Sequence, residues 1–213
     1  TEFNVDGAFS AVGTESQKVV FTSYRDDTFG GDTDGGGISE GRTGDWREIY
    51  FSDSSIDFIS RLEHVVIRYG GDGQANVYLN QATPSIVNSE ISFSSSDGIY
   101  INRESGHQIQ GNLIADNDGT GVYTSSASVV IEGNTIQDNG GQGIYHRYQA
   151  GNVVRGNTIT GNDNGIYVRG SGATIENNAI ENNRNWGIYY YNTGGSTPVL
   201  TGNTITGNKR SMR

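Results

Sequence analysis

The sequence predicts an all-β fold, a right-handed parallel β-helix with about 22 residues per turn and three short strands in each turn. Three observations predict it: a repeat of 21 to 25 residues, apolar residues at fixed places in that repeat, and asparagines at fixed places between them. A chain of 213 residues is long enough for such a fold to form one continuous domain.

The repeat is clearest in the second half of the chain, where GNLIADNDGTGVY begins at Gly111 and GNTIQDNGGQGIY begins at Gly133. Two further apolar positions accompany the central isoleucine, so each turn contributes to three apolar ladders. Glycine and asparagine break the segments and β-branched residues dominate them, which disfavours helices and favours short strands. Like residues then stack on like residues at ~4.8 Å per turn. The central ladder is Ile67, Ile91, Ile114, Ile136, Ile159, Ile180 and Ile205.

Asparagine recurs on both sides of the central isoleucine. Asparagine tolerates left-handed backbone and bonds to nearby backbone groups, and stacked amides bond along the axis. The sequence therefore predicts two structural asparagine ladders in the turns. They are Asn112, Asn134, Asn157, Asn178 and Asn203, and Asn117, Asn139, Asn162, Asn183 and Asn208.

The N-x-I-x-x-N…G-I-Y pattern of residues 60–208 resembles the parallel β-helix repeat of secreted bacterial surface proteins and polysaccharide-processing enzymes. The resemblance implies the fold and a secreted or cell-surface location. It leaves the function open, because this architecture carries lyases, hydrolases, epimerases, esterases and non-catalytic adhesins.

Composition narrows the classes of partner. The net charge is −10 and the isoelectric point about 4.6, so the surface repels phosphate backbones and nucleic acid is not an expected partner. No apolar run approaches the ~18 residues of a membrane span. The chain has no cysteine, which excludes disulfides and thiolate metal sites.

Residues 1–59 are less regular and are expected to form the first turns, with an Asp- and Gly-rich loop over residues 24–46. The series FTS…DD…GGDTDG…GDW in this region resembles a segment of large secreted bacterial β-helix proteins. Four carboxylates fall within nine residues of the loop, and calcium prefers oxygen ligands of this kind. The alternative is a polar turn in which the aspartates bond to their own backbone. The calcium hypothesis names Asp26, Asp27, Asp32 and Asp34.

The third strand of each turn predicts an aromatic stripe on the outer surface. Side chains alternate along a strand, so the tyrosine after each inward isoleucine or valine points outward. Two positions further on, also outward, stand Arg147 and Arg169 on adjacent turns, and Tyr191 follows on the next. Cross-strand stacking explains the tyrosines structurally. The functional alternative is a platform for an extended, anionic polysaccharide. The predicted stripe is Tyr78, Tyr100, Tyr123, Tyr145, Tyr167 and Tyr189.

Two functions follow from this surface. The first is a non-catalytic, structural or adhesive module of a larger secreted or cell-surface protein, flanked by further domains or repeats. Its support is the near-constant length of the turns, which leaves few loops for an active-site cleft. The second is a polysaccharide lyase or related carbohydrate-active enzyme on the same face, which eliminates next to a uronate with Arg147, Arg169 and His146 as its candidate residues. We expect His146 to point inward, and residues 209–213 to form a tail that fits no repeat.

Overall fold

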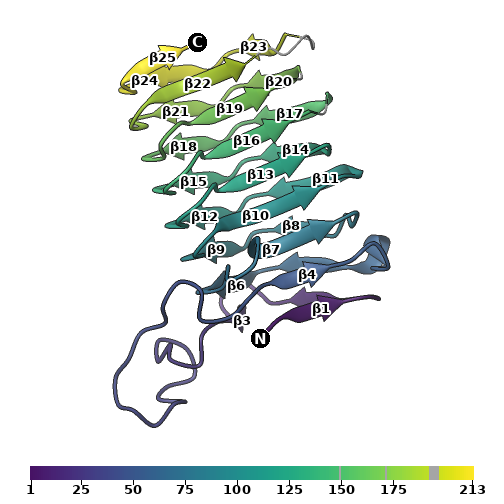
Figure 1. Cartoon of the computed structure of the whole chain (residues 1–213), viewed down its shortest axis with the longest axis vertical. Coiled ribbons are helices and arrows are strands. Elements are labelled where there is room, and N and C mark those ends of the chain that lie inside the picture. Colours follow the sequence, from purple (N-terminus) through teal and green to yellow (C-terminus); the bar gives the residue numbers. More distant parts are fainter. Residues whose placement is uncertain (149, 171, 192–196) are drawn as a thin grey trace.

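The computed structural model describes residues 1–148, 150–170, 172–191 and 197–213, and its strands wind into a parallel β-helix (Figure 1). Successive strands run from one sheet to the next, and each pairs in parallel with the strand one turn away. Within the described residues the strands form three sheets of nine, eight and eight strands, which we name sheets A, B and C. The predicted fold class is confirmed.

Sheet A contains the third strand of each repeat and therefore the tyrosines. Its strands are, in spatial order, β1 (Phe3–Val5), β4 (Ile49–Phe51), β7 (Ala75–Asn80), β10 (Asp97–Asn102), β13 (Val122–Ser125), β16 (Ile144–Arg147), β19 (Ile166–Arg169), β22 (Trp186–Tyr191) and β25 (Arg210–Met212).

Sheets B and C close the other two sides of the coil. Sheet B contains β2 (Ser10–Val12), β5 (Arg61–Glu63), β8 (Ser85–Val87), β11 (Ser105–Gln110), β14 (Ser128–Glu132), β17 (Asn152–Arg155), β20 (Ala173–Glu176) and β23 (Val199–Thr201). Sheet C contains β3 (Val19–Phe21), β6 (Val65–Arg68), β9 (Glu90–Ser92), β12 (Leu113–Ala115), β15 (Thr135–Gln137), β18 (Thr158–Thr160), β21 (Ala179–Glu181) and β24 (Thr204–Thr206). A 3₁₀ turn, η1 (Asp57–Ile59), lies between β4 and β5.

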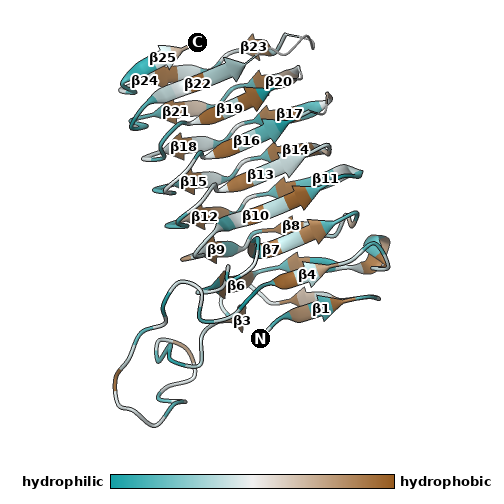
Figure 2. Cartoon of the chain, viewed as in Figure 1, coloured by the Kyte–Doolittle hydropathy of each residue, from teal (hydrophilic) through white to brown (hydrophobic). Residues whose placement is uncertain are grey.

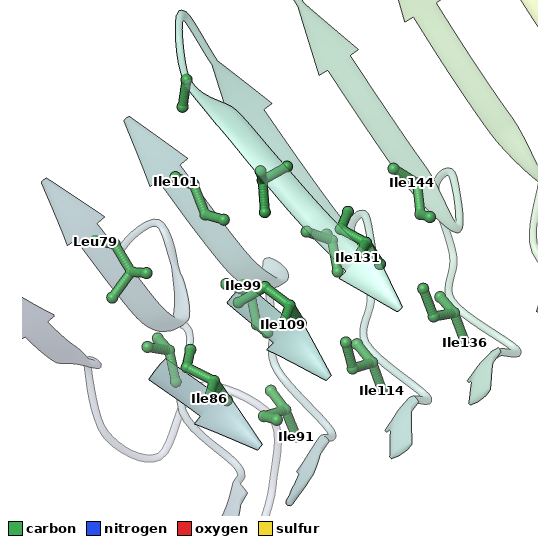
Figure 3. Packing of buried hydrophobic residues seen from close by; sticks show 14 of the residues in the cluster. Leu79, Ile86, Ile91, Ile99, Ile101, Ile109, Ile114, Ile131, Ile136 and Ile144 are labelled. Carbon is green, nitrogen blue, oxygen red and sulfur yellow. The ribbon is translucent and has the colours of Figure 1, made fainter. Parts of the chain in front are cut away.

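The core is a column of stacked aliphatic side chains inside the coil (Figure 3). Ile114, Ile136, Ile159 and Ile180 pair in register on sheet C and are fully buried, as predicted. Figure 2 shows the same pattern along the stack, with brown apolar segments repeating from turn to turn. Each turn buries its apolar residues against the turns above and below, as in other solenoids.

Both asparagine ladders are present and largely buried between sheets B and C and between sheets C and A. The Asn134 side chain illustrates one rung. Its Oδ1 accepts from the backbone N–H of Asn112 at 2.9 Å and its Nδ2 donates to the carbonyl of Ile109 at 2.9 Å. The same Nδ2 donates to Asn157 Oδ1 at 3.0 Å, which continues the ladder. The predicted structural role of these asparagines is confirmed.

The C-terminal residues correct one expectation. Arg210–Met212 form β25, which pairs in parallel with β22 through Trp186↔Arg210 and Ile188↔Met212. These residues therefore continue sheet A instead of forming a tail outside the repeats. The side chains repeat no motif, so the backbone pairing alone places them there. Among the described residues, no helix is long and apolar enough to cross a membrane.

Candidate functional site

The outer face of sheet A carries the tyrosine stripe, which is now defined as seven residues. The tyrosines of neighbouring strands pair in register and their ring centroids lie 4.7 to 5.1 Å apart. Four of the six neighbouring pairs are edge-to-face, the Tyr100–Tyr123 and Tyr167–Tyr189 pairs are stacked, and all seven rings are half-buried. The predicted outward register is thus confirmed, and the face offers ring edges and hydroxyl groups. The stripe is Tyr50, Tyr78, Tyr100, Tyr123, Tyr145, Tyr167 and Tyr189.

The second outward column of sheet A bonds to the tyrosine hydroxyls of the preceding turn. Asn80 Nδ2 donates to Tyr50 OH at 2.8 Å, and an Arg147 terminal nitrogen donates to Tyr123 OH at 3.2 Å. The residues of this column therefore orient the stripe. Equivalent side-chain hydrogen bonds join Asn102 to Tyr78, Ser125 to Tyr100 and Arg169 to Tyr145.

Two arginines and two tyrosines form what we name the arginine cluster: Arg147, Tyr148, Arg169 and Tyr191. The Arg147 guanidinium lies 4.5 Å from the Tyr148 ring centroid and donates to the Tyr148 hydroxyl at 2.9 Å. The Arg169 guanidinium lies 5.7 Å from the Tyr148 ring and 5.9 Å from the Tyr191 ring. Tyr148 and Tyr191 are about half exposed, so the cluster opens to solvent.

No carboxylate of the described residues forms an ion pair with the arginine cluster. Among the described residues, every ion pair involves other side chains, and none reaches Arg147 or Arg169. Hydrogen bonds to Tyr123 and Tyr148 raise the pKa of Arg147 above its ordinary value, and a bond to Tyr145 raises the pKa of Arg169. Neutral phenols therefore hold two like charges side by side, in a chain whose net charge is −10.

His146 lies on the opposite side of β16 from the arginines. It is fully buried, and its Nδ1 shares a 2.8 Å hydrogen bond with Thr124 Oγ1. Burial lowers its pKa to about 3. The inward placement predicted from alternation is confirmed. It also leaves the lyase hypothesis without its candidate base, because the ring does not reach the outer face.

Asp97, a residue that sequence reasoning missed, lies at the start of β10 near the stripe. Burial raises its pKa to about 6, and its Oδ1 accepts from the Thr120 backbone N–H at 2.7 Å. The ionised carboxylate contributes to the raised pKa of the Tyr100 hydroxyl, so the two side chains interact. A carboxyl group with such a pKa is suited to proton transfer near neutral pH. No sequence pattern identified it, because the raised pKa arises from burial by the next turn.

The aspartates proposed as calcium ligands each accept a hydrogen bond, from the loop itself or from β6. Asp26 is buried and receives two hydrogen bonds from Arg68, at 2.6 and 2.8 Å. Asp32 accepts from the backbone N–H groups of two glycines, Asp34 from one, and Asp27 from that of Ser39. No group of three or more metal-binding side chains converges in the described part of the chain. Calcium binding by this loop stays a prediction.

Thermal unfolding tests the calcium prediction. An ion bound by the folded loop raises the melting temperature by mass action when millimolar calcium replaces a chelator. Asp32→Asn should abolish that rise. Asp163→Asn, in the turn between β18 and β19, should preserve it. A melting temperature that ignores calcium in the unsubstituted protein would refute binding linked to folding.

Comparison with known proteins agrees with the geometry of the coil. A family model described as a right handed beta helix region matches residues 75–212. The crystal structure of the periplasmic alginate epimerase AlgG matches with a TM-score of 0.59 and 18% sequence identity, covering 78% of this chain and 47% of that one. A substituted form of AlgG matches with a TM-score of 0.63 and 17% identity, covering 100% of this chain and 62% of that one. The chain thus spans less than two thirds of these structures. No curated protein sequence matches it.

Proposed function

The chain belongs to the right-handed β-helix family, and we propose that it binds an extended anionic polysaccharide on sheet A without cleaving it. We further propose that it does so as a structural or adhesive module of a secreted or cell-surface bacterial protein. The observation that carries the proposal is the arginine cluster: two adjacent guanidinium groups without a carboxylate partner among the described residues. An anionic ligand relieves their mutual repulsion.

The tyrosine stripe gives the ligand its direction. Seven rings in six steps of ~4.8 Å make a track ~29 Å long, which spans several sugars of an extended chain. The half-buried rings present hydroxyls and edges, which suit hydrogen bonds and van der Waals contacts with sugars. Arg147 and Arg169 lie beside this track and point the same way. A polymer laid along the stripe can therefore place an acidic group against each arginine.

Alginate is the first ligand to test, because it is an anionic uronate polymer and the similar crystal structures are of an alginate epimerase. At 17 to 18% identity the likeness shows a common fold alone. It therefore suggests a probe and supplies no catalytic residue.

Titration calorimetry with mannuronate hexamers tests the proposal. We expect Arg169→Ala to weaken binding by about tenfold or more, since it removes a charge-assisted contact. Arg184→Ala is the matched control, because Arg184 is an exposed arginine on the turn between β21 and β22. Binding should also weaken with added salt, which screens exposed charges. Equal losses of affinity for both variants, or an affinity that does not change with salt, would argue against binding at the arginine cluster.

The second candidate is a carbohydrate-active enzyme on the same face, and the raised pKa of Asp97 favours it, although Asp97 pairs with the buried Ala75 and shares the inward register of Ile99. Its raised pKa gives it a suitable protonation equilibrium, although its Oδ1 is engaged by Thr120. The two functions separate in a product assay on uronate polymers. We expect no unsaturated ends, no new reducing ends and no epimerised residues. Turnover that Asp97→Asn abolishes would replace the binding proposal with the enzyme.

A further inference from the structure

A second concave surface lies on the outer face of sheet B, on a different side of the coil from the tyrosine stripe. It is a pocket of about 580 Å³, within the ~300–1,000 Å³ range of small-molecule sites. Its floor is formed by strands of sheet B and its wall by η1 (Asp57–Ile59). In Figure 1 the connection that contains η1 lies at the right-hand edge of the stack, beside the end of β4.

The floor is one column of polar side chains on four consecutive turns. Ser10 pairs with Arg61 and Arg61 with Ser85, and Gln108 takes the same place on β11, one residue before the Ile109↔Ile86 pair. On the next two turns the same column holds Val130 and Val153. The four turns beneath η1 thus carry the longest polar run of this column, which continues as valine, valine and then Thr174, so the fold accepts valine at this position.

The wall presents an aromatic ring that the core does not use. Phe58 is 89% exposed at the middle of η1. The neighbouring Asp57 fixes the turn, because its two carboxylate oxygens accept from Ser55 Oγ at 2.7 Å and from Thr83 Oγ1 at 3.0 Å. Ile56 and Ile59 beside it are also exposed, and an exposed apolar patch rimmed by polar residues is a feature of ligand-binding grooves.

The charge of this pocket differs from that of the arginine cluster. Asp57 and Arg61 are the charged residues that line it, and their charges cancel. Arg61 also lies 3.6 Å from Glu63, an acid on the same strand. The pocket therefore offers hydroxyl, amide and carboxylate groups without a net positive charge.

We propose that this pocket is a second ligand site, which takes a neutral saccharide of one to three rings. The Phe58 ring packs against the apolar face of one sugar ring, while Asp57, Ser85 and Gln108 exchange hydrogen bonds with the sugar hydroxyls. The inference is independent of the polysaccharide proposed for sheet A, since it concerns other residues and another chemistry of ligand.

Amide chemical-shift mapping of the whole chain tests this site, with cellotriose, mannotriose and maltotriose as neutral probes and trimannuronate as the anionic probe. We expect at least one neutral probe to shift the amides of Arg61, Ser85 and Gln108 at concentrations of up to about 10 mM. Phe58→Ala and Gln108→Val should each lower its affinity by about tenfold. Valine is a conservative choice, because the next two turns carry it at this position.

Two controls separate this site from sheet A. Ile38→Ala, at a fully exposed residue of the loop, should leave the affinity for the neutral probe unchanged, and so should Arg169→Ala. The proposal is overturned if no neutral probe shifts the sheet B amides, if only trimannuronate does, or if Phe58→Ala and Gln108→Val bind as tightly as the parent. None of these results tests the polysaccharide proposed for the tyrosine stripe. The hexamer titration and Arg169→Ala test that proposal separately.

Discussion

Asn134→Ala is expected to lower the free energy of unfolding by about 2–6 kcal/mol, because it orphans two buried backbone groups at about 1–3 kcal/mol each. The groups are the N–H of Asn112 and the carbonyl of Ile109, which the Asn134 amide satisfies. The substitution also interrupts the ladder between Asn112 and Asn157. Asn134 is 1% exposed, so water cannot replace the amide without opening the turn.

Urea denaturation measures this loss. Thr158→Ala is the control, since Thr158 is an exposed residue of sheet C and should change stability by no more than about 0.5 kcal/mol. A loss below about 1 kcal/mol for Asn134→Ala would mean that the ladder is not a main source of stability.

The second large effect is a loss of stability in acid that originates at His146. Burial lowers the pKa of this residue from 6.5 to about 3 in the folded chain, whereas the unfolded chain protonates it near its ordinary value. The unfolded state therefore binds the proton first, and stability falls as the pH drops from 6.5 toward 3. Between pH 7 and pH 5 the expected loss from this residue is about 2 kcal/mol.

His146→Val isolates this effect, because valine already occupies the equivalent inward position as Val168 on the next turn. Other groups titrate in the same range. His107 is buried with a lowered pKa and acts in the same direction, while the raised pKa of Asp97 stabilises the fold as the pH falls through 6. The measurement is thus the difference in stability between parent and variant at pH 7 and pH 5. A parent-like slope in His146→Val would contradict the account.

Periodicity was enough to predict the coil, because every turn has the same contacts with its neighbours. The central isoleucines and the asparagine ladders recur at a spacing that one turn of three strands explains, and the structure confirms both. Alternation along each strand likewise predicted which face the tyrosines occupy. Tyr50 obeys the same rule, since Ile49 and Phe51 on either side of it are buried, but it lies in the less regular first turns, outside the repeat pattern.

The remaining parts of the site depend on backbone geometry or on distant contacts. Tyr148 is left-handed, with φ of 71°, so the alternation of β16 does not determine where its ring lies. The Asp26–Arg68 pair joins residues that are 42 positions apart, so the local sequence around the aspartates does not predict it. The pocket beneath Phe58 likewise requires η1 to fold over strands from four turns.

The crystal structure of the chain with a bound mannuronate hexamer tests the central claim most directly. We expect uncleaved sugars along the tyrosine stripe, with one carboxylate against Arg147 and another against Arg169, at the ~2.7–2.9 Å distances of charge-assisted hydrogen bonds. A hexamer bound on another face, or bound on sheet A with no carboxylate near either arginine, would contradict the proposed function.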